Sequence, residues 1–216
     1  MVCAVNPILF AALYPIINLD SVPDFEAYLD QLHGAGLPYV QLRSKTLSDA
    51  EFLRLARTAV SRLRNRVRVI INDRIDICTL SGAAGVHLGQ DDLPPYQARR
   101  ILGPEAVIGY STHSVSDLTA AASEPVQYFG FGPIFPSATK SGQAPELGSD
   151  SLQQALKCAS LPVVPIGGIT LENVASLFRA GAKTVAVIRD LEQAADRTTQ
   201  ITAYQKIYTE LTASAL

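Results

Sequence analysis

The chain has 216 residues, 48% of them hydrophobic, and a formal net charge of −2 at pH 7. This length and apolar content are enough for a single domain, spanning residues 1–216, with a sizeable core. The slightly acidic balance supplies no basic surface, which argues against nucleic acid as a partner. The apolar run 8–17 is too short to span a bilayer and follows no basic segment, so we expect neither a membrane span nor a signal peptide.

The three cysteines, Cys3, Cys78 and Cys158, are odd in number and far apart. Their spacing matches no metal-binding pattern. We therefore expect reduced, buried thiols in a cytoplasmic protein.

Short apolar runs alternate with amphipathic segments along the whole chain. The expected strands are 13–18, 39–43, 67–72, 85–88, 107–111, 128–132, 162–166 and 184–188. The expected helices are 25–33, 48–64, 75–81, 96–102, 116–122, 151–159, 171–180 and 195–211, the second opened by a capping box from Ser48 to Glu51. Eight such units predict an α/β fold, a (β/α)8 TIM barrel, because a flavodoxin-like or Rossmann sheet needs only five or six strands.

Carboxylates follow two of the expected strands. Asp91 and Asp92 come after 85–88, and Asp73 comes after 67–72. In a barrel, the carboxyl ends of all strands meet at one opening, so Asp73 and Asp92 can face each other there. Two carboxylates suit Mg²⁺, which prefers oxygen ligands and retains water. The alternative is that these aspartates only cap the helices that follow.

Basic residues follow the second strand. Gln41, Arg43 and Lys45 lie within five residues and form either a clamp for a polyanion or a solvated charge cluster. A long polar loop, from about 132 to 148, carries Lys140, which could reach the same polyanion.

Three further groups lie at strand ends. The hydroxyls of Ser111 and Thr112 could bind a heterocycle or a phosphate, or could cap a helix. Gly167 and Gly168 precede a helix and could expose backbone N–H groups to a phosphate. His113 is expected to be structural, and His87, within a strand, to be a packing residue in the barrel wall.

Six short motifs occur in order along residues 13–191. They are Gln-Leu-Arg-x-Lys, Ile-Asn-Asp-Arg, Gly-Val-His-Leu-Gly-Gln-x-Asp-Leu-Pro, Gly-x-Ser-Thr-His, Gly-Pro-Ile-Phe-Pro-x-x-Thr-Lys and Ile-Gly-Gly-Ile. Together they resemble the thiamine phosphate synthase family. The resemblance implies a transferase that couples hydroxymethylpyrimidine diphosphate to hydroxyethylthiazole phosphate, giving thiamine phosphate and pyrophosphate with the help of Mg²⁺. Both substrates are small molecules, and a homo-oligomer is possible.

The resemblance also implies roles for individual residues. The pyrimidine diphosphate would be bound by Gln41, Arg43, Lys45, Asn72, Ser111 and Lys140, of which Arg43, Lys45, Ser111 and Lys140 are the expected catalytic groups. Asp73 and Asp92 would hold Mg²⁺. The thiazole phosphate pocket would be formed by Ser137, Ala138, Thr139, Gly167, Gly168, Ile188 and Arg189.

Two other functions stay open. One is a thiazole tautomerase, a related barrel that uses a histidine after the fifth strand, here His113. The other is a non-catalytic barrel that binds a thiazole or thiamine phosphate. Arg189 stands where the family usually has a small serine, and could either bind the phosphate through its side chain or crowd the site.

Overall fold

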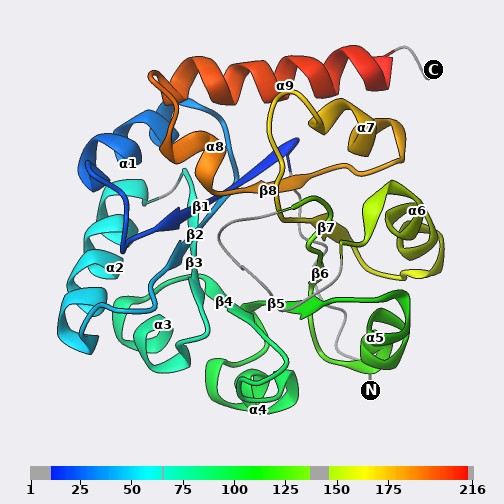
Figure 1. Ribbon diagram of the computed structural model, residues 1–216. Coiled ribbons are helices and arrows are strands. Elements are labelled where there is room, and N and C mark those ends of the chain that lie inside the picture. The colour runs from blue at the N-terminus through cyan, green and yellow to red at the C-terminus, as the bar shows by residue number, and fades with distance from the viewer. Residues whose placement is uncertain (1–10, 65, 137–145, 214–216) are drawn as a thin grey trace.

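Eight strands pair in parallel in the order β7-β6-β5-β4-β3-β2-β1-β8. The computed structural model describes residues 11–64, 66–136 and 146–213. A parallel bridge between Ile166, directly after β7, and Ala186 of β8 joins the two ends of this sheet. Figure 1 shows the resulting barrel, with the helices arranged around the strands. The predicted (β/α)8 fold is confirmed.

The elements have the following bounds. The strands are β1 Leu13–Asn18, β2 Tyr39–Arg43, β3 Arg68–Asn72, β4 Gly85–Leu88, β5 Val107–Thr112, β6 Tyr128–Phe131, β7 Val163–Pro165 and β8 Val185–Val187. The helices are α1 Phe25–Gly34, α2 Asp49–Leu63, α3 Ile75–Ser81, α4 Pro95–Leu102, α5 Val115–Ala120, the 3₁₀ turn η1 Ala121–Ser123, α6 Gly148–Cys158, α7 Val174–Arg179, α8 Arg189–Glu192 and α9 Arg197–Ala213.

The predicted elements are all present, with differences at their ends. The helix expected over 116–122 divides into α5 and η1, and α6 begins at Gly148, before the expected start. The helix expected from 171 begins only at Val174, because the Asn173 side chain accepts a hydrogen bond from Thr170 N and forms a turn there. Helix α8 was not predicted, since a single turn is too short to show a helical repeat.

Side-chain caps mark where several helices begin. Ser48 Oγ accepts a hydrogen bond from Glu51 N, as the capping box predicts, and Asp24 does the same for Ala27 N at the start of α1. Ser114 caps α5 by accepting from Asp117 N. These caps set the points at which each loop turns back from the barrel rim into a helix.

The core has two layers. Aliphatic side chains that point outward from the strands pack against the helices, as Leu13, Ile17 and Leu42 do. The inward side chains form a second cluster inside the barrel, which contains Tyr14 and Tyr128. The alternation of inward and outward positions along each strand produces this division.

The expectation of buried thiols is only half right among the described residues. Cys78 is buried and free, and burial raises the pKa of its thiol to about 12. Cys158 is free but exposed, because it lies on the outer face at the end of α6. Cys3 lies outside the described residues.

In the described parts of the chain, none of the helices has both the length and the apolar content to cross a membrane.

Gly85 allows close pairing of β4 and β5, and this gives a test of the packing. A Cβ atom at Gly85 would lie 1.8 Å from the Val107 carbonyl oxygen, which is fixed in the neighbouring strand. We expect Gly85→Ala to lower the free energy of unfolding by about 3 kcal/mol or more, measured by urea titration.

The control is Gly34→Ala at the end of α1, where a Cβ meets no atom within 4 Å. This variant should be unchanged or more stable by up to about 1 kcal/mol. Equal stability of the two variants would contradict the packing.

Candidate functional site at the carboxyl rim of the barrel

A pocket opens at the carboxyl ends of the strands. The predicted site residues that line it are Gln41, Arg43, Asn72, Ser111, Gly167, Gly168, Ile188 and Arg189. They come from or directly follow five different strands, so the barrel brings together residues that are far apart in the sequence. Apolar side chains, among them Ile16, Val164 and Ile166, form much of the wall. Such a pocket can hold an apolar ring between polar groups.

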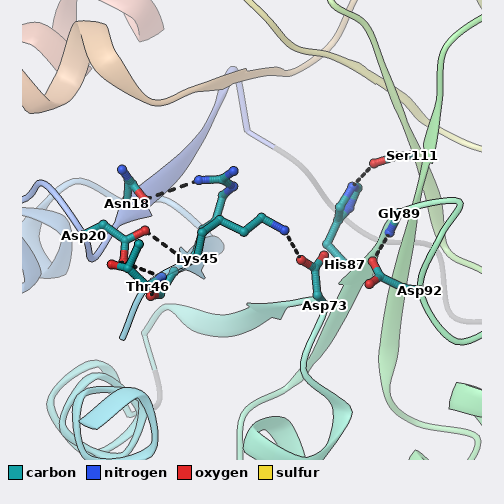
Figure 2. A network of polar contacts seen from close by, with 11 residues as sticks. Asn18, Asp20, Lys45, Thr46, Asp73, His87, Gly89, Asp92 and Ser111 are labelled. Carbon is teal, nitrogen blue, oxygen red and sulfur yellow. Dashed lines mark hydrogen bonds and ion pairs between the residues drawn. The ribbon is translucent and has the colours of Figure 1, made fainter. Parts of the chain in front are cut away.

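Lys45, Asp73 and Asp92 lie together at the rim. The Lys45 ammonium group contacts Asp73 Oδ2 at 2.7 Å, and the two side chains are 55% and 21% exposed. Figure 2 shows Lys45 reaching across to Asp73, with Asp92 on the next strand end. The lysine and the two carboxylates thus form one compact group beside the pocket.

Asp73 has an unusual backbone conformation. Its φ is +63°, which makes it a non-glycine residue in the left-handed region. Arg74 N donates to Asn72 O at 2.7 Å, so the chain makes a very tight turn across Asp73. Asp73 N also donates to His87 O at 2.8 Å, which ties this turn to β4. Strained residues of this kind are concentrated at functional sites.

The environment of Asp92 favours a nearby cation. Burial and, to a smaller extent, the adjacent Asp73 carboxylate raise the pKa of Asp92 above its usual value, whereas the hydrogen bond from Gly89 N and the charge of Lys45 lower it. Gly89 N donates to Asp92 Oδ2 at 2.7 Å, which fixes the orientation of the carboxylate. Two neighbouring carboxylates, one of them partly desolvated, form a site for positive charge.

The helix-cap alternatives do not hold for these aspartates. Helix α3 has Arg74 at its N-cap and α4 has Pro94, and neither helix has a side-chain cap hydrogen bond. For α5 the cap is Ser114, so Ser111 and Thr112 are not needed in that role. Thr112 Oγ1 instead donates to Gly130 O.

Asp20 organises the loop that carries Lys45, and sequence analysis missed it. Its carboxylate accepts hydrogen bonds from Ser44 Oγ at 2.6 Å, from Lys45 N at 2.7 Å and from Thr46 Oγ1 at 3.0 Å. Figure 2 shows Asp20 against this loop, on the side away from Asp73. Desolvation raises the pKa of Asp20, but the hydrogen bonds outweigh it and the net pKa is lowered. The sequence shows no signal for this contact, because Asp20 lies after β1 and the loop follows β2.

Gly167 and Gly168 lie where the chain after β6 packs on the chain after β7. Both have positive φ, +100° and +63°. A Cβ at Gly168 would lie 2.4 Å from Pro136 O, so only glycine fits without a shift of the backbone. Arg189, at the start of α8, lines the same end of the pocket, and Ile188 lies next to it. This end combines backbone groups with a guanidinium group.

The floor of the pocket contains polar residues, of which Tyr14, His87 and Tyr128 were not among the predicted site residues. Tyr14, Gln41, Tyr128, His87 and Ser111 all line it, each from a different strand. His87 packs on the Tyr128 ring in the barrel wall, as expected, and also hydrogen-bonds Tyr128 and Ser111, which the sequence did not predict. The sequence carried one signal for it, a histidine between Val86 and Leu88 in an otherwise apolar strand.

His113 is held by the surrounding chain. Its Nδ1 donates to Gly132 O at 2.6 Å, since a carbonyl oxygen can only accept, and its backbone N donates to Asp117. The ring lines the pocket.

The remaining predicted site residues, Ser137, Ala138, Thr139 and Lys140, lie outside the described residues.

Within residues 11–64, 66–136 and 146–213 there is no group of three or more His, Cys, Asp or Glu side chains that could hold a metal ion. Asp73 and Asp92 place two carboxylates next to each other. This donor set does not suit Zn²⁺, but it suits a hard cation that completes its coordination with water and phosphate oxygens.

The chain is similar over most of its length to proteins of a known family. The family model described as thiamine monophosphate synthase matches residues 13–191. The chain is 40% identical over 185 residues to a thiamine-phosphate synthase of Koribacter versatilis, covering 83% of this chain and 88% of the relative. It is 38% identical over 198 residues to thiamine-phosphate synthase 2 of Streptococcus pneumoniae, covering 90% and 93%.

A solved structure agrees with these matches. The thiamine phosphate pyrophosphorylase of Pyrococcus furiosus superimposes with a TM-score of 0.83 at 28% identity, covering 93% of this chain and 96% of that one.

The pKa of Asp20 gives a test of the loop that carries Lys45. A lowered pKa in the folded state means that the ionised carboxylate stabilises the fold above its unfolded pKa of about 3.9. That stability is lost as pH falls through the lower, folded pKa.

We expect Asp20→Asn to lower the free energy of unfolding at pH 7 by less than about 1 kcal/mol, because the group is exposed. The difference from the unmodified protein should be smaller below about pH 3.9 than at pH 7. Urea titrations at both pH values measure this, with the exposed Asp91→Asn as control, and a pH-independent difference would contradict it.

Proposed function

The chain belongs to the thiamine monophosphate synthase family, and we propose that it condenses an aminopyrimidine methyl diphosphate with a thiazole phosphate, releasing pyrophosphate. The substrates are 4-amino-2-methyl-5-hydroxymethylpyrimidine diphosphate and 4-methyl-5-(2-hydroxyethyl)thiazole phosphate. The product is thiamine phosphate. The observation that carries the proposal is the group formed by Lys45, Asp73 and Asp92 at the mouth of a pocket with polar and apolar walls.

The chemistry requires charge stabilisation more than a protein nucleophile. The pyrimidine ring can delocalise the methylene cation that remains when the diphosphate leaves, and the thiazole nitrogen then attacks that carbon. The protein has to bind the departing diphosphate and align the two rings. Arg43 lines the pocket, and its Nη1 donates to Asn18 Oδ1 at 3.4 Å, which leaves other guanidinium N–H groups for phosphate oxygens. Lys45 would add a point charge, and Lys140 is proposed to act on the same diphosphate.

Asp73 and Asp92 are the proposed ligands of Mg²⁺. Their carboxylates provide hard oxygen donors, and the raised pKa of Asp92, caused by burial and by Asp73, favours a cation at this position. When bound, Mg²⁺ would supply positive charge to the departing diphosphate. In the ligand-free structure, Lys45 partly neutralises the pair through Asp73.

The opposite end of the pocket is proposed to bind the thiazole phosphate. The turn at Gly167 and Gly168 and Arg189 line this end. Ser137, Ala138 and Thr139 are proposed to complete it. Because Arg189 lies in the wall of the pocket, we propose that it binds the phosphate and does not block it.

A direct assay tests the function. Purified protein is incubated with Mg²⁺ and both substrates, and the products are identified by mass spectrometry. We expect thiamine phosphate and pyrophosphate. An isomerised thiazole alone would instead support a tautomerase that uses His113, and bound but unchanged ligands would support a non-catalytic barrel.

The metal ligands are tested with two neighbouring aspartates. We expect Asp92→Asn to lower turnover by roughly 100-fold or more, because one of two metal-binding carboxylates is lost while the hydrogen bond from Gly89 N can still be accepted. Asp91→Asn, which changes an exposed carboxylate one residue away, should keep the original turnover. Circular dichroism and urea titration confirm that both variants fold. Normal turnover by Asp92→Asn would remove the metal assignment.

Lys45 is expected to act on the diphosphate and not as a metal ligand. We expect Lys45→Gln to lower turnover by about 10- to 100-fold through loss of a charge-assisted contact. Mg²⁺ binding to the substrate-free protein, measured by calorimetry, should be equal or tighter, because a cation competing for Asp73 is removed. Weaker Mg²⁺ binding in this variant would contradict the assignment, and the exposed Lys206→Gln on α9 is the control.

A further inference from the structure

A continuous series of hydrogen bonds crosses the inside of the barrel below the pocket. Gln41 Nε2 donates to the Tyr14 hydroxyl at 3.1 Å, and this hydroxyl lies 3.1 Å from that of Tyr128. The Tyr128 hydroxyl lies 2.9 Å from His87 Nδ1, and His87 Nε2 lies 2.9 Å from Ser111 Oγ. Five strands each contribute one residue, and the last, Ser111, is a proposed substrate contact.

The amide donor at one end of the series favours one direction for it. An amide N–H can only donate, so the Tyr14 oxygen accepts from Gln41 and its own proton can pass to Tyr128. In this direction Tyr128 donates to His87 Nδ1, 2.9 Å away. An imidazole that accepts at Nδ1 carries its proton on Nε2, and Nε2–H donates to Ser111 Oγ.

Burial supports this direction by keeping both phenols protonated. Desolvation raises the pKa of Tyr14, and the same burial raises the pKa of Tyr128 well above its usual value. Each hydroxyl therefore retains one proton to donate. Chains of buried hydrogen bonds also polarise one another, so a consistent direction is favoured over a mixed one.

Glycines on β5 and β6 leave room for the imidazole. A Cβ at Gly109 of β5 would lie 2.1 Å from Tyr128 Cζ and 2.5 Å from His87 Nδ1. A Cβ at Gly130 of β6 would lie 3.0 Å from His87 Cε1. The ring also packs on Tyr128, with 5.4 Å between centroids. The position of His87 is therefore defined by packing as well as by hydrogen bonds.

We propose that His87 is a positioning residue whose Nε2–H tautomer holds Ser111 as a hydrogen-bond donor toward the pocket. Since the Ser111 oxygen accepts from His87, its own proton is directed to another acceptor. Gln41 acts at the far end of the series by selecting the tautomer.

The consequence for the substrate rests on the proposed function. An aminopyrimidine diphosphate offers Ser111 two kinds of acceptor, an unprotonated ring nitrogen and a phosphate oxygen. A ring that presents only N–H or C–H groups to Ser111 would leave the Ser111 hydroxyl proton without an acceptor. Such a ring would bind less well. His87 thus contributes to the choice of heterocycle without touching it.

The tautomer can be observed directly by ¹⁵N NMR of the imidazole rings in the full-length, substrate-free protein. The chain has three histidines, so the spectrum is simple. We expect the His87 signals to show a protonated Nε2 and an unprotonated Nδ1 at pH 7. His113 is an internal reference with the opposite pattern at Nδ1, because that nitrogen donates to Gly132 O. The spectrum of His87→Gln identifies the His87 signals by their loss.

Two outcomes of the NMR experiment overturn the proposal. One is a His87 ring protonated at Nδ1 only, which would reverse the series and make Ser111 donate to His87. The other is a doubly protonated ring, which could not accept from Tyr128. Gln41→Glu is the matched test, since a carboxylate accepts from Tyr14 and should move the His87 proton from Nε2 to Nδ1.

Kinetics with paired variants separate positioning from packing. His87→Gln places an amide close to the position of Nε2 and can still donate to Ser111, whereas His87→Asn places it close to Nδ1 and cannot. We expect kcat/KM to fall roughly 5- to 30-fold in His87→Asn and in Ser111→Ala, and no further when the two are combined. His87→Gln should stay within about 3-fold of the unmodified protein. Losses that multiply in the double variant, or equal losses in His87→Gln and His87→Asn, would overturn the positioning role.

The two kinds of failure are distinguishable. If the assay yields no thiamine phosphate, the proposed function fails, but the NMR spectrum still decides whether His87 carries its proton on Nε2. If thiamine phosphate is formed and the tautomer is the opposite one, the inference on His87 fails alone.

Discussion

The structure depends on one constraint, that all eight strands run in parallel and end at the same rim. Each helix returns the chain to the opposite end of the barrel, so every strand-to-helix loop reaches the same opening. Arg43, Asp73 and Ser111 meet there although long stretches of sequence separate them. Closure through Ile166 and Ala186 brings the end of β7 beside β8, which places the glycine turn and Arg189 on one wall.

Charge balance decides how the rim is built. Asp73 and Asp92 repel each other, and burial adds to the cost of ionising Asp92. Lys45 offsets part of this cost through its contact with Asp73, and Asp20 fixes the loop that carries Lys45 by accepting from its backbone. The same residues therefore stabilise the rim and would provide the charges that the proposed metal ion and diphosphate require.

Inside the barrel, the arrangement of side chains depends on hydrogen bonds between buried polar groups. Tyr14, Tyr128 and Gln41 are nearly inaccessible to water, and hydrogen bonds connect the Tyr14 hydroxyl to the other two side chains. An unsatisfied polar atom at this depth would cost about 1–3 kcal/mol, so the series has to be continuous. Its last member, Ser111, lines the pocket. The series of hydrogen bonds therefore extends from the inside of the barrel to the site.

Sequence patterns predict the alternation of strands and helices, the barrel that follows from it, and several of the residues around the pocket, because these depend on local periodicity and on position at strand ends. Helix ends at Ser48 and Asp24 were also local, since a cap acts within one turn. Contacts between side chains that are far apart in the sequence could be seen only in the folded chain. Tyr14 and Tyr128 are 114 residues apart, and Asp20 and Lys45 are 25 apart on different loops. Such contacts depend on strand register and barrel closure, which bring distant residues within hydrogen-bond distance only after the whole sheet has formed.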